Sequence, residues 1–268
     1  VRSRDGEMVL RMEDLDTQRT SAEFAQILRE DLAWLGLDYD RETAPQSQRS
    51  DVYDRYFEQL REMGLLYPCY CTRSQLHSVN APHLSDGTYV YPGTCRNLQN
   101  PPAGRKPSWR VMVPDQEWTL IDRIQGTYTE NLATHCGDFV VRRADGVYVY
   151  QLAVTVDDGL AGVTQVVRGS DLLDSTPRQL WLQDALGLPH PEYAHVPMLL
   201  APDGRRLSKR DRDMDLGQLQ SRMTAEQLIG KLAFAANLTK TDDAISAKEL
   251  ATVFDWENLR KDEICLRL

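Results

Sequence analysis

The order of strand-like and helix-like segments limits the possible folds of this chain more than any other feature. The segment MVLRMEDLD (8–16) begins as an apolar strand and ends in acidic residues. Thr20 and Glu23 follow with the spacing of a capping box, in which Thr20 is the N-cap. Apolar residues at helical spacing then run to Gly36, and a second helix is expected from about Ser50. A strand followed by a helix at this spacing is typical of an α/β layer.

The same kind of pattern returns in the second half of the chain. DFVVRRADGVYVYQLAVTVDD (138–158) holds two β-rich runs around Ala-Asp-Gly, which predicts a hairpin. GVTQVVRG (162–169) predicts a buried strand, and SDLLDSTPRQLWLQDALG (170–187) predicts a helix with a proline in its first turn. AHVPMLL (194–200) predicts a further short strand. The body of the protein is therefore expected to be α/β.

The C-terminal part has a different character. Thr224 with Gln227, and Ser246 with Glu249, form two further capping boxes. No strand pattern follows Leu216. We therefore expect a small helical module at this end.

Charge and composition exclude several classes of protein. The 268 residues carry a net charge of −9, which argues against broad, sequence-blind binding to nucleic acid but not against RNA bound on a local basic face. No apolar run approaches the length of a bilayer span, and no secretory signal is visible, so we expect a cytoplasmic protein without a membrane partner. The chain is long enough for one large domain or two modest ones.

The cysteines lie mostly in one irregular segment. Three of the five fall between Tyr67 and Gly104, a stretch rich in proline, glycine, asparagine and serine that lacks a long apolar period. Such a stretch inside a compact domain is usually an insertion with its own constraint. An odd number of unevenly spaced cysteines makes a disulfide framework improbable, and a metal site or reduced thiols fit better.

Zinc is the metal that this pattern suggests. Cys69 and Cys71 are close together on one extended segment, and Cys95 lies in a turn-like YPGTC. Tetrahedral zinc needs a fourth ligand. Three side chains nearby offer one: Tyr91, His83 and His77. Spacing alone favours His83, because tyrosinate is an uncommon ligand; the alternative is three reduced cysteines without metal.

Three polar residues stand where a ligand site is expected. Glu13 lies where the first strand passes into a loop, and ligands of open α/β sheets bind outside the carboxyl ends of strands. Tyr150 and Arg168 are single polar residues in apolar, strand-like runs, and a buried arginine needs an anion. For Glu13 the alternative role is helix capping, and for the other two it is structural pairing.

A basic loop follows the last strand-like run. GRRLSKRD (204–211) carries Lys209 among three arginines. A lysine is a compact charge suited to phosphate oxygens, and loop amides can add donors. Composition alone leaves a solvated turn as the alternative.

Five segments together carry a family resemblance. RMEDLDTQR, YPCYC, YQLAVTVDD, VVRGSDLL and HVPMLLAPDGRRLSKR, in this order, resemble the catalytic core of the glutamyl-tRNA synthetase group of class I synthetases, over residues 1 to about 215. The resemblance implies a Rossmann-type parallel sheet core with a zinc-bearing insertion and a short C-terminal helical module. It divides the chain into 1–66 and 128–203 (the core), 67–127 (the insertion) and 204–268 (the loop and helical module).

The resemblance also implies roles for individual residues. RRLSKR is similar to the KMSKS loop, so Lys209 would stabilise the phosphates of ATP, which enters with Mg²⁺, while the adenylate forms. Glu13 would contact the ammonium group of bound glutamate, and Tyr150 and Arg168 would help to hold the same amino acid. The implied ligands of one zinc ion per chain are Cys69, Cys71, Tyr91 and Cys95, in place of His83.

The short C-terminal part favours one branch of this group. Only residues 216–268 follow the loop, too few for the helical domains with which a full glutamyl-tRNA synthetase reads an anticodon. The chain is more similar to the short paralogues that transfer glutamate to queuosine in the anticodon loop of tRNA(Asp), and we expect a monomer. The alternatives are a truncated enzyme that charges a tRNA 3′ end, and a catalytically silent RNA- or nucleotide-binding remnant.

One departure concerns the start of the chain. The family opens with a strand and a helix that carry a HIGH-type motif with ATP-binding histidines, and VRSRDGEMVL resembles the region after them. Strand and helix together would be roughly 30 residues, most of a βαβ unit. We expect the sequence to be incomplete at its start, because a sheet without a central strand would expose long unpaired edges.

Overall fold

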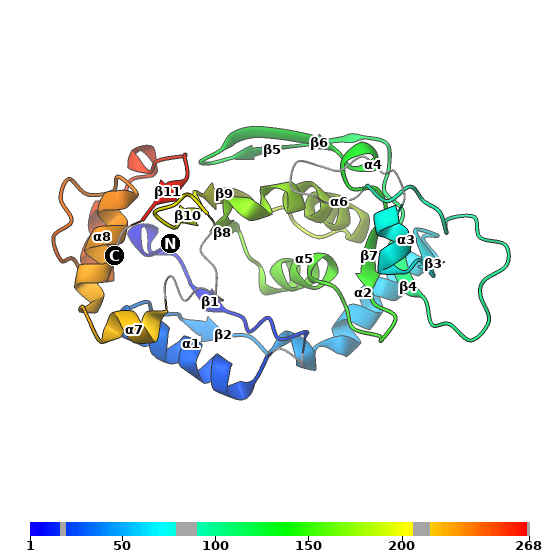
Figure 1. The fold of residues 1–268 in the computed structure, drawn as a ribbon, viewed down its shortest axis with the longest axis horizontal. Helices are drawn as coiled ribbons and strands as arrows, with labels where there is room; N and C mark the ends of the chain where they lie inside the picture. The colour runs from blue at the N-terminus through cyan, green and yellow to red at the C-terminus, as the bar shows by residue number, and fades with distance from the viewer. Residues whose placement is uncertain (17–19, 79–89, 206–214, 267–268) are drawn as a thin grey trace.

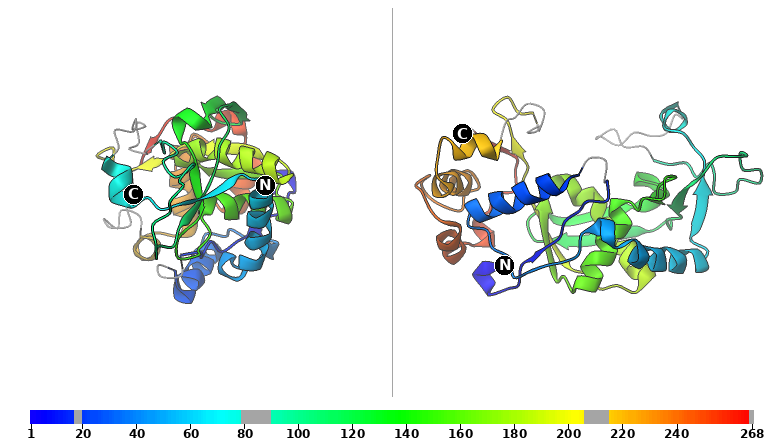
Figure 2. Two further views of the ribbon diagram at one scale, coloured as in Figure 1. Left: turned by 90° about the vertical axis from the view of Figure 1, so that its right-hand side faces the viewer. Right: turned by 90° about the horizontal axis from the view of Figure 1, so that it is seen from below.

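The computed structural model describes residues 1–16, 20–78, 90–205 and 215–266. These residues form an elongated molecule, with the cysteine-bearing segment at one end and the C-terminal helices at the other (Figure 1). The right-hand view of Figure 2 shows the same lengthwise arrangement, and the left-hand view looks along the molecule from the end with the cysteine-bearing segment. Within these ranges, no helix is both long and apolar enough to cross a membrane.

A parallel βαβ unit forms the centre of the molecule. Strand β8 (Gln165–Gly169) pairs in parallel with β9 (Glu192–Val196), and the register places Arg168 beside His195. The crossover consists of a 3-10 helix, η3 (Ser170–Ser175), and helix α6 (Thr176–Leu186), as the sequence predicts. Gly187 ends α6 at a φ of 67°, a left-handed conformation that favours glycine.

The predicted hairpin over 138–158 is only half correct. Its first run is strand β7 (Phe139–Arg142), and the turn closes with an antiparallel bridge between Arg142 and Tyr148. Its second run, however, is helix α5 (Tyr150–Ala161), so Tyr150 begins a helix and the strand prediction was wrong. Every residue from 151 to 158 is buried. A helix buried all round lacks an amphipathic period, and its β-branched residues then resemble a strand.

The main core lies between the central helices and a three-stranded antiparallel sheet. Helix α2 (Ser50–Glu62) packs with α5 and α6 against strands β3 (Leu66–Cys69), β4 (Ser108–Val111) and β7 in the order β3-β4-β7. Both layers contribute side chains that are completely buried, among them Tyr53, Leu60, Val111, Val141, Leu152 and Leu182. This core anchors the cysteine-bearing segment, because β3 leads directly into it.

The N-terminal part is a smaller strand and helix layer. Its elements are η1 (Arg2–Arg4), β1 (Val9–Leu10), α1 (Ala22–Trp34), β2 (Arg41–Glu42) and η2 (Gln46–Gln48), with β1 parallel to β2. The predicted capping box is wrong by one residue. Ser21 is the N-cap and accepts from the N–H of Phe24, whereas the Thr20 hydroxyl donates to the carbonyl of Asp16. Adjacent threonine and serine both suit this position, so the sequence alone could not choose.

A hairpin and two short helices complete the middle of the chain. They are β5 (Glu117–Asp122) with β6 (Gly126–Asn131), α3 (Arg73–Ser78) and α4 (Leu132–His135). The hairpin packs along α6 and β9. Its tip is bound to β9, since the N–H of Arg123 donates to the carbonyl of Tyr193.

The C-terminal part is mainly helical, as expected. Its elements are β10 (Leu199–Leu200), α7 (Leu216–Gln220), α8 (Ala225–Ala235), α9 (Ala247–Val253), η4 (Trp256–Asn258) and β11 (Ile264–Cys265). The capping boxes at Thr224 and Ser246 are confirmed. The expectation of no strand in this part was wrong, because β11 pairs in parallel with β10. A two-residue strand has no period of its own and depends on its partner.

Candidate functional site

A large cleft opens beside the central βαβ unit. It measures about 1280 Å³, and residues of the β1 region, α5 and β8 line it. Glu13, Tyr150 and Arg168 all lie on its wall. The structure thus brings the three predicted amino-acid-binding residues to one cavity, although they are up to 155 positions apart (168 − 13) in the sequence. Their roles toward a substrate stay predictions.

Arg168 is held by a dense set of contacts. Its Nη1 donates to Tyr150 Oη over 3.4 Å, and its Nε donates to His195 Nε2 over 3.0 Å. Its Nη2 donates to Thr176 Oγ1 over 2.8 Å and to the carbonyl of Leu172 over 3.3 Å. Because the guanidinium contacts β9, η3 and the start of α5, its position in the cleft is well defined.

Glu13 is paired with an arginine that sequence reasoning missed. Arg11 Nη2 donates to Glu13 Oε1 over 2.9 Å, and Arg11 Nη1 donates to Asp158 Oδ1 over 2.5 Å. Burial raises the pKa of Asp158, while the adjacent Arg11 acts against that shift. Glu13 is exposed on the cleft wall, so a carboxylate is available there to a cationic group.

The acid next to Glu13 has a structural role. Asp14 Oδ1 accepts from the N–H of Ser47 over 2.8 Å, and its Oδ2 accepts from the Ser47 hydroxyl over 2.6 Å. Asp14 therefore fixes η2 against the segment after β1, and of these two adjacent acids it is Glu13 that lines the cleft.

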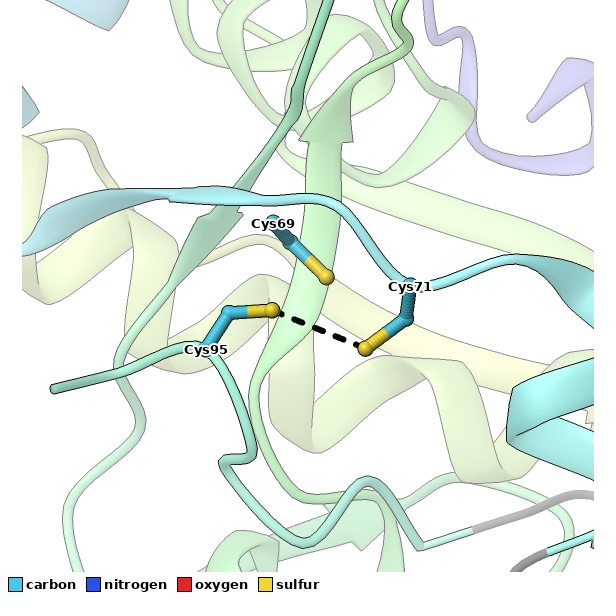
Figure 3. A group of neighbouring side chains, drawn as sticks. All are labelled: Cys69, Cys71 and Cys95. Carbon is cyan, nitrogen blue, oxygen red and sulfur yellow. Dashed lines mark hydrogen bonds between the residues drawn. The ribbon is translucent and has the colours of Figure 1, made fainter. Parts of the chain in front are cut away.

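The second candidate site is the cysteine cluster. The sulfurs of Cys69, Cys71 and Cys95 all lie within 4.8 Å of one another, and none of these thiols is in a disulfide. Figure 3 shows the three side chains converging from two segments, with 3.6 Å between the sulfurs of Cys71 and Cys95. Two sulfurs bound to one tetrahedral zinc lie about 3.8 Å apart, given a Zn–S bond of about 2.3 Å. The spacing therefore fits a shared metal ion.

Tyr91 points into the same cluster. Its hydroxyl oxygen lies 3.4 Å from the sulfur of Cys69 and 3.7 Å from that of Cys71. It also accepts from the N–H of Cys95 over 2.9 Å. Four donor atoms, three sulfurs and one oxygen, thus surround one position that a metal ion could occupy. His83 lies outside the described residues, and His77 lies in α3.

The thiols differ in how readily they ionise. Burial opposes ionisation of Cys69, but hydrogen bonds from Tyr91, the N–H of Cys71 and Arg110 lower its pKa to about 7. Burial raises the pKa of Cys71 to about 11. A thiol with a lowered pKa gives up its proton more readily to a bound cation.

A shell of polar groups supports the cluster. Arg110 donates from Nε to the Cys69 sulfur over 3.3 Å and from Nη1 to the carbonyl of Asp138 over 2.6 Å. The carboxylate of Asp138 accepts from Tyr67 Oη over 2.6 Å and from Arg96. Such outer partners hold metal ligands in orientation.

Gly137 sets the position of Tyr91. The two residues form a parallel bridge, and a Cβ on Gly137 would lie 2.3 Å from the carbonyl oxygen of Tyr91. Gly137 also has a φ of 63°. Only glycine meets both conditions without displacing Tyr91.

The remaining prediction concerns the basic loop. Lys209 lies outside the described residues, so its role stays a prediction. At the edge of the loop, Arg205 Nε donates to Asp203 Oδ2 over 3.0 Å.

Comparison with known proteins identifies the family. Residues 1–264 match the family model described as tRNA synthetases class I (E and Q), catalytic domain. The chain is 42% identical to a glutamyl-Q tRNA(Asp) synthetase of Symbiobacterium thermophilum, over 98% of this chain and 87% of that protein. It is 48% identical to one of Thiobacillus denitrificans, over 79% of this chain and 69% of the relative.

A solved structure agrees in fold. The crystal structure of glutamate-tRNA synthetase from Elizabethkingia anophelis matches 99% of this chain with a TM-score of 0.82 and 26% identity. The chain spans 62% of that protein's length. These likenesses confirm the expected α/β class I synthetase core. The chain belongs to the class I tRNA synthetases of the E and Q group and, within them, to the family of glutamyl-Q tRNA(Asp) synthetases.

Proposed function

We propose that the protein activates glutamate with ATP and transfers it to queuosine in the anticodon loop of tRNA(Asp). The single observation that carries this proposal is the convergence of Glu13, Tyr150 and Arg168 on one cleft beside the parallel strands. The names of the relatives at 42% and 48% identity support the choice of queuosine and tRNA(Asp).

The cleft residues suit the two charged ends of the substrate. Exposed Glu13 would bind the ammonium group of glutamate, because an exposed carboxylate can pair with a cation without a large desolvation cost. Arg168 would bind the side-chain carboxylate, for which its planar guanidinium is well matched, and the Tyr150 hydroxyl next to it would add a hydrogen bond. The α-carboxylate is then left to react with ATP.

The reaction has two steps. An oxygen of the α-carboxylate of glutamate attacks the α-phosphorus of ATP, the bond to the bridging oxygen breaks, and pyrophosphate leaves with Mg²⁺. A hydroxyl of queuosine then attacks the acyl carbon, an ester forms, and AMP leaves. In the first step we assign phosphate neutralisation to Lys209, so that positioning and charge stabilisation account for the catalysis.

We further propose that Cys69, Cys71, Tyr91 and Cys95 hold one zinc ion. The spacing of the donors and the supporting contacts of Arg110 favour this assignment. Bound zinc would join the segment after β3 to the turn at Cys95, and the chemistry at the cleft would not pass through it. We also propose that the protein acts as a monomer in the cytoplasm, where ATP and tRNA are found.

Amino acid activation gives the first test. Measured on the complete protein, glutamate should support ATP–pyrophosphate exchange, and aspartate and glutamine should support little. Aspartate is one methylene shorter, and glutamine lacks the side-chain charge. Equal exchange with glutamine would contradict the charge-based roles of the cleft residues, and no exchange with any of the three would contradict the activation step.

A further inference from the structure

A buried acid–histidine pair lies directly behind Arg168. Asp122 at the end of β5 and His195 on β9 are 2% and 0% exposed. The Nδ1 of His195 lies 2.6 Å from Asp122 Oδ2, while its Nε2 lies 3.0 Å from Arg168 Nε. Asp122, His195 and Arg168 thus form a continuous chain from the hairpin to the cleft wall.

The hydrogen bonds define the protonation of the ring. The Nε of arginine can only donate, so Nε2 of His195 accepts from Arg168. The hydroxyl of Thr176 also lies 3.3 Å from Nε2, and since it accepts from Arg168 Nη2, it can donate its own proton to the ring. The ring proton is therefore on Nδ1, where it donates to the carboxylate of Asp122. A proton on Nε2 would place two donors against each other.

The other oxygen of Asp122 fixes the carboxylate itself. Oδ1 accepts from the backbone N–H groups of Ile124, Gln125 and His195 over 2.8–3.1 Å. Only Oδ2 is left for the imidazole ring. The hairpin tip thereby sets the orientation of the acid, and the acid sets the tautomer of His195.

The His195 ring, which lies between Asp122 and Arg168, leaves the guanidinium of Arg168 able to bind an anionic substrate. A carboxylate in direct contact would form a bidentate pair with Arg168 and compete with an anionic substrate. His195 occupies only Nε. The Nη1 nitrogen of Arg168 carries two N–H groups, and one of them donates to Tyr150. The other has no partner among the described residues. The arrangement compensates the half-buried positive charge of Arg168 at a distance and keeps one of its N–H donors available in the cleft.

We infer that Asp122 and His195 are positioning residues of the glutamate pocket: Asp122 fixes the tautomer of His195, and His195 holds Arg168 in the orientation that binds the substrate carboxylate. This inference rests on the proposed function. It assigns to the β5–β6 hairpin a role in amino acid recognition.

The Asp122→Asn variant tests this chain of contacts. The amide must keep its oxygen toward the three backbone N–H groups, so its NH₂ group faces Nδ1 of His195. The ring then carries its proton on Nε2 and can no longer accept from Arg168. We expect the KM for glutamate to rise about tenfold or more, with the KM for ATP little changed. Glu130→Gln, a buried acid on the same hairpin that pairs with Tyr128, is the matched control and should keep the KM for glutamate.

A double-mutant cycle separates positioning from a merely structural role. The His195→Gln variant lacks the imidazole ring through which Asp122 is inferred to act on Arg168. Adding Asp122→Asn to it should therefore raise the KM for glutamate little further. Independent, additive effects of the two substitutions would overturn the inference, as would an unchanged KM in Asp122→Asn.

The tautomer is measured without any substrate. ¹⁵N NMR of the histidine side chains, assigned with His195→Gln, should show the parent ring protonated on Nδ1 only and the Asp122→Asn ring protonated on Nε2. A parent ring protonated on Nε2 would overturn the inference. A parent without glutamate-dependent exchange would contradict the proposed function, and the NMR result would still decide the present inference.

Discussion

The guanidinium of Arg110 lies 3.7 Å above the ring centroid of Tyr91, and its Nε donates to the sulfur of Cys69. One buried cation therefore contacts the sulfur of Cys69 and the aromatic ring of Tyr91, two of the four residues of the proposed zinc site. Three thiolates around one Zn²⁺ carry a net negative charge even before tyrosine is counted. A positive charge at this position stabilises the loaded cluster.

Replacing Arg110 should weaken metal binding without removing a ligand. We expect Arg110→Met to lower zinc affinity by about 10- to 100-fold, measured by competition with a chelator, and Arg110→Lys to lower it less. Arg142→Met is the control, because Arg142 lies 5.0 Å from the Tyr148 ring centroid, away from the cysteines. Equal affinities for the parent and Arg110→Met would contradict the assigned role of this residue.

The ligand set gives a second prediction. Protein purified without added metal should hold about one zinc per chain by elemental analysis, and Cys69→Ser or Cys95→Ser should lose it. Cys136→Ser should keep it, because that buried thiol donates to the carbonyl of Leu132 and lies outside the cluster. Loss of zinc in His83→Ala together with retention in Tyr91→Phe would show that the fourth ligand is misassigned.

The ionisation of Asp122 should make the stability of the fold depend on pH. Burial opposes its ionisation, but hydrogen bonds from His195 and the N–H groups of the hairpin tip lower its pKa to about 2, from an ordinary value of 3.8. A depressed folded-state pKa contributes stability above the unfolded-state pKa, and this stability is lost as the pH falls through the folded-state value.

The measurement compares the parent with Asp122→Asn. The parent should have the larger free energy of unfolding, by about 2 kcal/mol from this ionisation. This difference should be complete above about pH 4 and should shrink as the pH falls toward 2. Urea denaturation at several pH values gives the difference. A difference that stays constant over this range would show that the carboxylate charge does not stabilise the fold.

The successes and failures of sequence reasoning have distinct physical causes. The capping boxes at Thr224 and Ser246 were predictable because their hydrogen bonds join residues three apart. Helix α5 was not, because burial on all sides removes the period that distinguishes a helix from a strand. For the proposed metal site, the spacing suggested the three cysteines as ligands but favoured His83 as the fourth ligand. Tyr91 as the fourth ligand followed only from the family resemblance.

The contacts behind the cleft could not be found in the sequence at all. His195 is 27 residues from Arg168 and 73 from Asp122, and no local pattern links them. Only the pairing of β8 with β9 and the docking of the hairpin bring them together. The division into 1–66, 67–127, 128–203 and 204–268 stays a prediction.

Lys209 gives a further prediction about the adenylation step. If its ammonium group neutralises phosphate as the adenylate forms, Lys209→Ala should slow glutamate-dependent pyrophosphate exchange by a factor of roughly thirty to a thousand, with ATP affinity less changed. Arg205→Ala should lower the exchange rate much less, because Arg205 pairs with Asp203. Similar small losses in both variants would identify the loop as a solvated turn.

The site of glutamate transfer tests the central claim most directly. Labelled glutamate and ATP are supplied with three forms of tRNA(Asp): one with queuosine, one with guanosine at that position, and one with queuosine but without the 3′-terminal adenosine. We predict equal labelling of the two queuosine forms, none of the guanosine form, and loss of the label in mild base, as an ester requires. Labelling that depends on the 3′-terminal adenosine and not on queuosine would contradict the account.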